Sequence, residues 1–242
     1  MANGVLVLGA TSTIARALSA RWARDGVPLH LVGRDTPELE RIAQDLRIRY
    51  GSDVSVLGCD IAAGDFPQAT VTAMGQHAPL RGIVWAFGTM VAADGAADAQ
   101  SLRAGAWVNF GAAPPLIEAL LPLVDRQGFI AFLSSVAGDR GRQSNYVYGA
   151  AKAALSVYGL GLRHRLRGAG PSVTVLKLGV VDTRMSWGMG VPGGAADPEA
   201  VAAEVQRAIG AGKAVAYVPR RWALVMAVIR HLPEPLFNLL RI

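Results

Sequence analysis

Short apolar runs that alternate with longer helical patterns constrain the fold more than any other feature of this sequence. The runs are rich in β-branched or bulky side chains, as buried strands are. They cover residues 5–8, 28–32, 54–57, 83–87, 129–133, 173–178 and 215–218. Helical patterns separate them at residues 14–24, 37–50, 66–77, 102–124, 145–167 and 198–210. This alternation predicts an α/β fold, a Rossmann-type doubly wound domain whose seven-stranded parallel sheet carries helices on both faces.

The domain organisation follows from length and composition. The chain has 242 residues, of which 52% are hydrophobic and 17% are charged, so it can bury one sizeable core. No internal repeat, low-complexity tract or linker interrupts it. We expect residues 1–219 to form the dinucleotide-binding and catalytic domain. Residues 220–242 are expected to be an amphipathic extension of that domain.

Cysteine and leader patterns indicate the compartment. Cys59 is the only cysteine and the four histidines are scattered, so neither a disulfide framework nor a metal site is predicted. The first ten residues lack the charged region and apolar core of a signal peptide, and no apolar run approaches the roughly 18 residues of a membrane span. We therefore expect a cytoplasmic protein.

The net charge of +6 raises the question of anionic partners. No basic run is interleaved with aromatic residues, so nucleic-acid binding is not expected. Four arginines and one glutamate give residues 220–242 a net charge of +3, half of the total. Together with the apolar residues of the same segment, this charge favours docking on the inner face of the membrane or over a lipid-binding pocket. The alternative is a tail buried between subunits.

A turn of small residues follows the first apolar run and opens a helix. Small side chains let backbone N–H groups and the helix N-terminus approach a pyrophosphate. Dinucleotide binding is therefore expected at Gly9, Thr11, Ser12, Thr13 and Ile14. Only one of these is glycine, so an ordinary strand-to-helix turn is the alternative.

Arg34 follows the second apolar run, at the place where an acidic residue would hold a ribose 2′-hydroxyl. An arginine there suits a 2′-phosphate, so the sequence predicts a preference for NADP(H). Asp35 comes one place later and leaves NAD(H) open as well.

Tyr148 and Lys152 are four residues apart in a helical segment, which puts both side chains on one face. A phenol with an ordinary pKa near 10 exchanges protons poorly at neutral pH, so acid–base chemistry needs a cation beside it. At about 4 Å and an effective dielectric of about 20, that cation contributes about 4 kcal/mol, near three pKa units. This would bring the phenol pKa towards 7, less any opposing desolvation.

Ser135 lies thirteen residues before Tyr148, at the end of the fifth apolar run. With these motifs in this order, the chain resembles the short-chain dehydrogenase/reductase family over essentially its whole length. The resemblance implies an NAD(P)-dependent oxidoreductase of alcohols or carbonyls in which Tyr148 protonates the developing alkoxide and Ser135 hydrogen-bonds the same oxygen. It also implies that Lys152 holds the nicotinamide ribose and that Asn109 anchors a proton-relaying water.

The resemblance extends to the cofactor site and to the assembly. Further cofactor-binding residues that it implies are Asp60, Ile61, Ala86, Phe87, Gly88, Gly179, Val181 and Thr183, besides Tyr148 and Lys152. Thr13 and Ala15 stand where the family turn has glycines, and Leu178 stands where it has proline, which puts fine details of cofactor geometry in doubt. A homo-dimer or homo-tetramer through the helices at Leu102 and Asn145 is expected.

A closer resemblance is carried by residues 134–152, the triplet from Ala86 to Gly88, and the tail of residues 217–242. These segments are similar to the reductases of the decaprenylphosphoryl-ribose 2′-epimerase system, the decaprenylphosphoryl-D-erythro-pentosid-2-ulose 2-reductases of arabinan and cell wall polysaccharide biosynthesis. The resemblance implies a lipid-linked 2-keto pentose as substrate and a flavoprotein oxidase as partner. Arg140, Arg142 and Arg184 are then expected near the substrate phosphate. The alternatives are a short-chain dehydrogenase for another small or hydrophobic alcohol or ketone, and a non-catalytic dinucleotide-binding scaffold.

Overall fold

A single parallel sheet organises the chain, and the computed structural model describes residues 3–62, 66–90, 98–188 and 194–238. The strand order is β3-β2-β1-β4-β5-β6-β7. The strands are β1 (Val5–Leu8), β2 (Leu29–Gly33), β3 (Val54–Gly58), β4 (Leu80–Trp85), β5 (Val124–Ser135), β6 (Ser172–Leu178) and β7 (Val215–Val218). The order reverses between β1 and β4, so the predicted doubly wound, seven-stranded parallel sheet is confirmed. Ligands of such sheets bind at this switch point, beyond the carboxyl ends of the strands.

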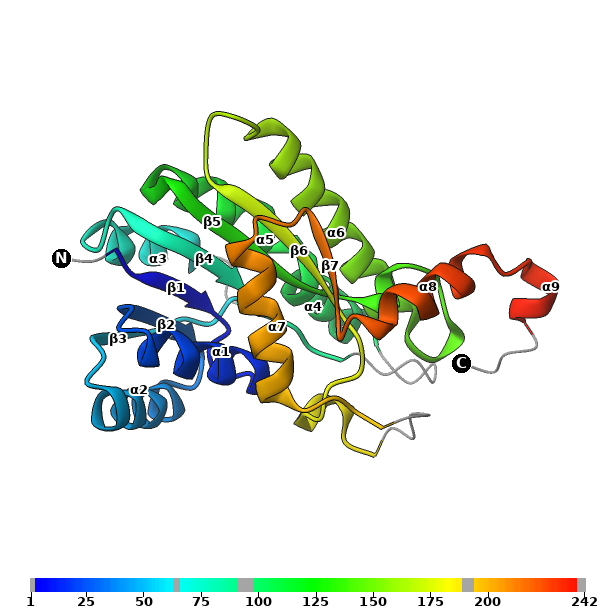
Figure 1. Ribbon diagram of the computed structural model, residues 1–242, viewed down its shortest axis with the longest axis horizontal. Coiled ribbons are helices and arrows are strands. Elements are labelled where there is room, and N and C mark those ends of the chain that lie inside the picture. Colours follow the sequence, from blue (N-terminus) through cyan, green and yellow to red (C-terminus); the bar gives the residue numbers. More distant parts are fainter. Residues whose placement is uncertain (1–2, 63–65, 91–97, 189–193, 239–242) are drawn as a thin grey trace.

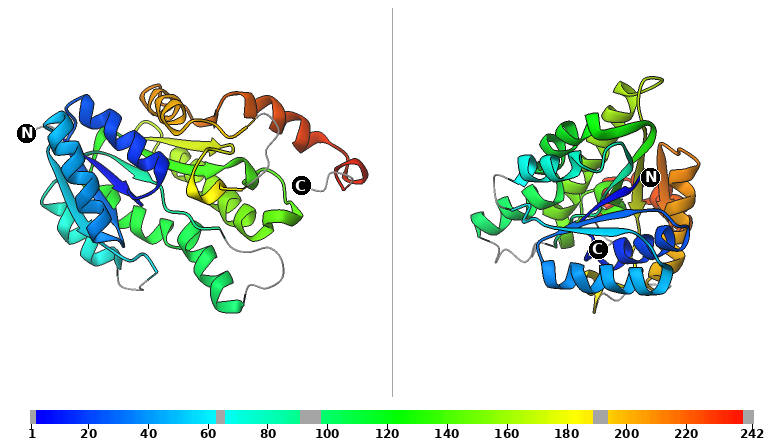
Figure 2. Two further views of the ribbon diagram at one scale, coloured as in Figure 1. Left: turned by 90° about the horizontal axis from the view of Figure 1, so that it is seen from below. Right: turned by 90° about the vertical axis from the view of Figure 1, so that its left-hand side faces the viewer.

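Helices cover both faces of the sheet (Figures 1 and 2). One layer contains α1 (Thr13–Arg24), α2 (Thr36–Tyr50) and α7 (Pro198–Gly210), and the other contains α3 (Phe66–Gly75), α4 (Ala99–Ala106), α5 (Ala113–Leu120) and α6 (Tyr146–Arg165). Each layer has its own buried cluster, around Leu18 and Leu39 on one side and around Leu116 and Leu155 on the other. Because both faces of the strands are buried, the strands read as continuous apolar runs rather than as alternating ones.

The helix predicted over residues 102–124 is broken in the structure. After α4, the chain makes a π turn at Trp107–Gly111 and then enters α5, followed by a 3-10 turn at Leu121–Leu123. Pro114 and Pro115 lie in the first turn of α5 and cannot donate to the carbonyls four residues earlier, so a continuous α-helix is interrupted there. The π turn places Asn109 in the protein interior.

Two predicted strands have different bounds in the structure. β4 ends at Trp85 rather than at residue 87, so Ala86, Phe87 and Gly88 lie in the loop beyond the sheet. β5 runs from Val124, five residues before the predicted start, because it pairs with β4 again beyond a register shift. Beyond the sheet, the Ala86 N–H still donates to the Leu8 carbonyl at 2.8 Å and the Phe87 carbonyl accepts from Lys152 at 3.2 Å, so this loop is tied to β1 and to α6.

The chain continues past β7 into α8 (Arg221–His231) and α9 (Glu234–Phe237), which extend beyond the carboxyl ends of the strands (Figure 1). Met226 and Phe237 are buried against the body, whereas Leu224 and Val228 are 76% and 66% exposed. The last four residues of the predicted tail, 239–242, lie outside the described residues. Within the described ranges, no helix combines the length and apolarity that crossing a bilayer requires.

Candidate active site

The turn between β1 and α1 is built for close backbone approach. Gly9 has a φ of +85°, and a Cβ there would lie 2.8 Å from backbone atoms of Ala86 and Phe87. Ser12 caps α1 by accepting a hydrogen bond from the N–H of Ala15 at 3.2 Å. The first N–H groups of a helix have no intrahelical acceptor, so those of Thr13 and Ile14, the first two residues of α1, face outward to a ligand. Thr11 is half-buried in the same turn.

Arg34 and Asp35 follow β2, and their side chains have different surroundings in the structure. The Asp35 carboxylate accepts a hydrogen bond from the N–H of Glu38 at 3.0 Å and caps α2. Arg34 is exposed, and none of the ion pairs in the described part of the chain involves it. The cation is therefore available to a ligand, whereas the carboxylate already stabilises a helix.

The residues after β3 include two of the predicted cofactor-binding residues. Asp60 is exposed and accepts a hydrogen bond from the N–H of Ala62 at 2.9 Å. Ile61 is buried, and its carbonyl accepts a hydrogen bond from the Trp107 indole at 2.7 Å. The π turn thus holds this loop in place.

Ser135 is the last residue of β5 and precedes a 3-10 turn at Val136–Gly138. Its hydroxyl accepts a hydrogen bond from the N–H of Ala137 at 3.1 Å. The turn packs against α6 so closely that a Cβ on Gly138 would lie 2.6 Å from the nitrogen of Ala153. This contact fixes Ser135 relative to the helix that carries Tyr148.

Tyr148 and Lys152 lie side by side on α6. The Lys152 ammonium is 5.7 Å from the centre of the Tyr148 ring, and it donates to the carbonyls of Phe87 at 3.2 Å and Leu133 at 3.1 Å. Burial lowers the pKa of Lys152 to about 8, because its charged form loses water.

The pKa of Tyr148 differs from the expectation of a value near 7. Burial raises the pKa of the phenol above 10, and a side-chain hydrogen bond with Ser135 opposes this rise. Desolvation therefore outweighs this hydrogen bond in the protein alone. The phenol keeps its proton at neutral pH.

Asn109 is fully buried, so it is not a helix-surface amide. Its Nδ2 donates to the carbonyls of Thr89 and Gly105, both at 2.8 Å, and its Oδ1 accepts from the N–H of Thr89 at 3.2 Å. A Cβ on Gly88 would lie 3.3 Å from both the Asn109 Oδ1 and the Lys152 ammonium. The amide oxygen and the ammonium therefore both border the small space beside Gly88.

Gly179, Val181 and Thr183 follow β6. A Cβ on Gly179 would lie 1.9 Å from the indole nitrogen of Trp222, so α8 rests directly on this glycine. Val181 is buried and pairs with Ala196. The N–H of Thr183 donates to the Ser186 hydroxyl at 3.1 Å and closes a 3-10 turn. Residues 189–193 of the following segment lie outside the described residues.

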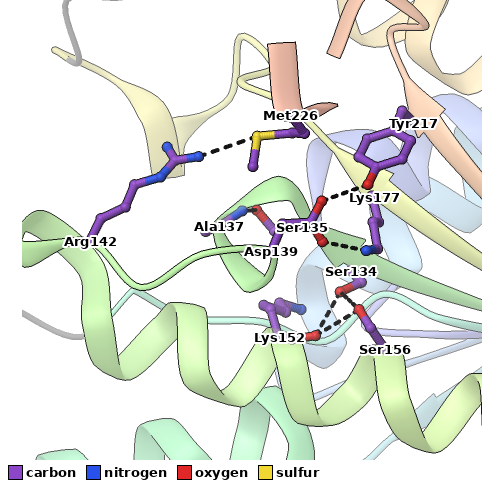
Figure 3. A network of polar contacts seen from close by, with 10 residues as sticks. All are labelled: Ser134, Ser135, Ala137, Asp139, Arg142, Lys152, Ser156, Lys177, Tyr217 and Met226. Carbon is purple, nitrogen blue, oxygen red and sulfur yellow. Dashed lines mark hydrogen bonds and ion pairs between the residues drawn. The ribbon is translucent and has the colours of Figure 1, made fainter. Parts of the chain in front are cut away.

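A buried polar network holds the turn that follows Ser135, here called the serine turn, on the side of β6 and β7 (Figure 3). The Asp139 carboxylate, only 2% exposed, pairs with Lys177 of β6 and accepts a hydrogen bond from the Tyr217 hydroxyl of β7 at 2.6 Å. The Asp139 partners are 38 and 78 residues away along the chain, so no local motif announces them. The signal in the sequence is Lys177, a charged residue in a strand whose other residues are uncharged.

Arg140 joins the same turn to the C-terminal helices. Its guanidinium donates to the carbonyls of Ile229 at 2.6 Å and Leu232 at 2.5 Å, pairs with Glu234 at 2.7 Å, and lies 3.8 Å from the ring centre of Phe237. The expectation that Arg140 meets a substrate phosphate is therefore wrong, because its donors already bind α8 and α9. Arg184 is exposed at the start of its 3-10 turn.

The residues present fit a nicotinamide dinucleotide. The tight turn at Gly9, the free N–H groups of the α1 N-terminus, and the exposed Arg34 can hold its phosphates, and the loop from Ala86 to Gly88 can approach its ribose. In the described part of the chain, no three metal-binding side chains gather into one site.

Comparison with known proteins agrees with this geometry. The family model described as short chain dehydrogenase matches residues 3–190. An uncharacterized oxidoreductase of Streptomyces coelicolor is 31% identical, covering 98% of this chain and 95% of its own, and one of Mycobacterium tuberculosis is 33% identical, covering 95% and 94%. The structure of a Sphingobium yanoikuyae short-chain dehydrogenase in complex with NADPH superposes with a TM-score of 0.81 at 22% identity, covering 96% and 97%. The chain belongs to the short-chain dehydrogenase family of oxidoreductases.

Proposed function

We propose that this oxidoreductase uses NADPH to reduce a carbonyl group at the site formed by Ser135, Tyr148 and Lys152. The observation that carries the proposal is the buried Lys152 ammonium 5.7 Å from the ring centre of Tyr148, with Ser135 held against the same helix by the contact of Gly138 with Ala153. Two hydroxyls that converge on one point can both hydrogen-bond a single carbonyl oxygen. A non-catalytic scaffold has no need of this arrangement.

Each of these residues has a distinct task in the reduction. A bound nicotinamide dinucleotide supplies the hydride. Tyr148 donates its proton to the oxygen of the carbonyl, and its raised pKa ensures that the proton is present at neutral pH. Ser135 donates a second hydrogen bond to the same oxygen and stabilises the negative charge that develops there.

Lys152 restores the proton that Tyr148 gives away. Its pKa of about 8 is close to neutral, so the ammonium can release and regain a proton during turnover. Asn109 borders the same small space beside Gly88 as the ammonium and is suited to anchor a water there. Lys152 also orients the nicotinamide ribose in this proposal.

The cofactor preference rests on the residues after β2. Arg34 is free to bind a 2′-phosphate, whereas Asp35, which would otherwise hold a 2′-hydroxyl, caps α2. The NADPH in the Sphingobium yanoikuyae relative supports the same choice. NAD(H) is expected to serve as a weaker cofactor.

The substrate that we propose is a 2-keto pentofuranosyl group on a polyprenyl phosphate, reduced at C2 to the arabinose epimer for arabinan synthesis. A polyprenyl tail must lie in a bilayer or an apolar groove, and α8 presents Leu224, Val225 and Val228 to solvent beside Arg220 and other basic residues. This surface supports peripheral attachment to an anionic membrane. Reduction at C2 requires a prior oxidation there, which a flavoprotein oxidase partner would perform. The second candidate is another hydrophobic ketone.

We also propose that the chain forms a homo-dimer or homo-tetramer through α4 and α6. Val157 and Leu160 of α6 are 71% and 38% exposed. Two large apolar side chains on the outer face of a long helix favour a covered interface. Sedimentation of the purified protein tests this assembly.

Replacement of Tyr148 by phenylalanine tests the catalytic assignment. Turnover with NADPH and a carbonyl substrate should fall at least about 100-fold, because the proton donor is lost. NADPH binding should change little, and Tyr146→Phe, on an exposed tyrosine two residues earlier, provides the matched control. Retention of more than about a tenth of kcat would overturn the assignment.

Deuterium from labelled NADPH tests the substrate. The label should appear at C2 of the arabinose when the keto-lipid is supplied. If the enzyme leaves this lipid unchanged and efficiently reduces a water-soluble ketone or a steroid, the second candidate is correct.

A further inference from the structure

The inner face of α8 lies over the residues that follow β5 and β6. Trp222 packs on Gly179, the residue after Leu178, and Leu178 is the strand partner of Ser135. One helical turn later, the Met226 sulfur lies 3.5 Å from an Nη of Arg142 (Figure 3). Residues four apart on a helix are neighbours on its surface. One face of α8 therefore contacts both Arg142 and Gly179, and Gly179 follows the strand partner of the proposed catalytic serine.

Both side chains carry a buried donor without an acceptor. In the part of the chain that the structure describes, the Arg142 Nε and the Trp222 Nε1 have no hydrogen-bond partner. The one hydrogen bond of the Arg142 guanidinium is to a thioether, which is a weak acceptor. Burial lowers the pKa of Arg142, and the charge of Asp139 opposes this effect. Asp139 itself is already paired with Lys177.

Arg140, two residues earlier in the same segment, provides a comparison because its guanidinium has several partners. It has two carbonyl acceptors, a carboxylate and an aromatic ring. Arg142 has none of these among the described residues. Arg142 is partly buried and its Nε is shielded from water without an acceptor, so an anionic partner would be favourable at this position.

We propose that Arg142 and Trp222 form a subsite for an oxyanion of the substrate, such as a phosphate. A guanidinium fork binds an oxyanion through two parallel hydrogen bonds, and the indole N–H supplies a third. An oxyanion held there would orient the attached carbonyl towards Ser135 and Tyr148. The inference rests on the proposed reductase function and narrows its substrates to ketones that carry an oxyanion.

Inhibition by inorganic phosphate at saturating NADPH tests the subsite. In the wild type, phosphate should compete with the carbonyl substrate. Arg142→Leu should raise the inhibition constant at least about 10-fold, the loss typical of a charged hydrogen bond. Arg142→Lys should recover part of the affinity. Arg167→Leu, which removes an exposed arginine beyond the far end of α6, should leave it unchanged.

Trp222→Phe removes the N–H donor together with the five-membered ring that contacts Gly179, and keeps an aromatic side chain at this position. It should raise the inhibition constant about 2- to 10-fold, as loss of one neutral hydrogen bond does. This variant keeps the test decisive if Arg142→Leu does not fold. An inhibition constant that changes less than about twofold in both variants, or competition with NADPH in place of the carbonyl substrate, would overturn the inference.

Thermal unfolding gives a readout that is independent of activity. Phosphate added to the NADPH complex should raise the melting midpoint of the wild type and of Arg167→Leu, and should raise that of Arg142→Leu much less. An equal rise of the melting midpoint in all three proteins would contradict the proposal that phosphate binds at Arg142. If the wild type reduces no carbonyl compound and phosphate still stabilises it through Arg142, the proposed function fails and the subsite stands.

Discussion

Raising the pH from 7 to 9.5 is expected to stabilise the folded protein through Lys152. Only 3% of this residue is exposed, its ammonium donates to two carbonyls, and no ion pair among the described residues involves it. Burial lowers its pKa from 10.5 to about 8. At pH 7 the folded protein therefore carries a charge that would be better solvated in the unfolded chain.

The sign and size of the effect follow from proton linkage. Because the folded pKa is lower than the unfolded one, the unfolded chain binds more protons between pH 8 and pH 10.5, and stability rises with pH in that window. With values of about 8 and about 10.5, the gain between pH 7 and pH 9.5 is about 2 kcal/mol. For a chain of this length, that corresponds to a rise of roughly 4–8 °C in the melting midpoint.

Urea unfolding of the wild type and of Lys152→Met at the two pH values measures this contribution. Methionine keeps most of the apolar stem and does not titrate, whereas every other titrating group is common to both proteins. The difference in free energy of unfolding should shift by about 2 kcal/mol in favour of the wild type at pH 9.5. If the two proteins respond to pH in parallel, within about 0.5 kcal/mol, the ammonium is not desolvated as described.

Four further outcomes are expected. Burial lowers the pKa of His30 to about 4, so stability should fall by about 3 kcal/mol as the pH drops from 6.5 to 4, and urea unfolding of His30→Gln should show a flatter profile. Arg34→Ala should lower kcat/KM for NADPH at least about 10-fold and leave that for NADH nearly constant; equal losses would refute the 2′-phosphate contact. Arg140→Met should lower the free energy of unfolding by about 2–3 kcal/mol in urea, since two carbonyls and an ion pair lose their donor; an unchanged midpoint would contradict its role. Leu224→Glu with Val228→Glu should abolish sedimentation with anionic vesicles at low salt, and unchanged sedimentation would exclude this face as the membrane contact.

The sheet could be predicted from the sequence because both of its faces are buried. Each strand then appears as a short apolar run, and the helices between them carry their own period. The bounds of strands and helices were less predictable where tertiary contacts determine them. Strand β5 extends backwards to Val124 because β4 pairs with it, and the break at Asn109 depends on how two prolines interrupt a helix that is otherwise well patterned.

The core of the candidate site could also be predicted, because Ser135, Tyr148 and Lys152 are linked by fixed spacings in one segment. The contacts of the residues that surround them could not be predicted. The partners of Asp139 and Arg140 are 38 to 94 residues away and come from β6, β7, α8 and α9. The direction of the Tyr148 pKa shift depends on desolvation, which a sequence pattern does not measure.

The long reach of Arg140 has a consequence for the order in which the molecule is assembled. Its acceptors lie 89 to 94 residues further along the chain, so the contacts that hold the turn after Ser135 against α8 and α9 cannot form until these helices have been synthesised. Contacts of such sequence separation carry a loop-closure cost and tend to form late. The β1–α1 turn needs only β2 and β4 and can form much earlier. We expect the β1–α1 turn of a nascent chain to fold first and the turn after Ser135 to reach its final packing last. Pulsed hydrogen exchange should then show protection of β1 before protection of the serine turn, and simultaneous protection would contradict this order.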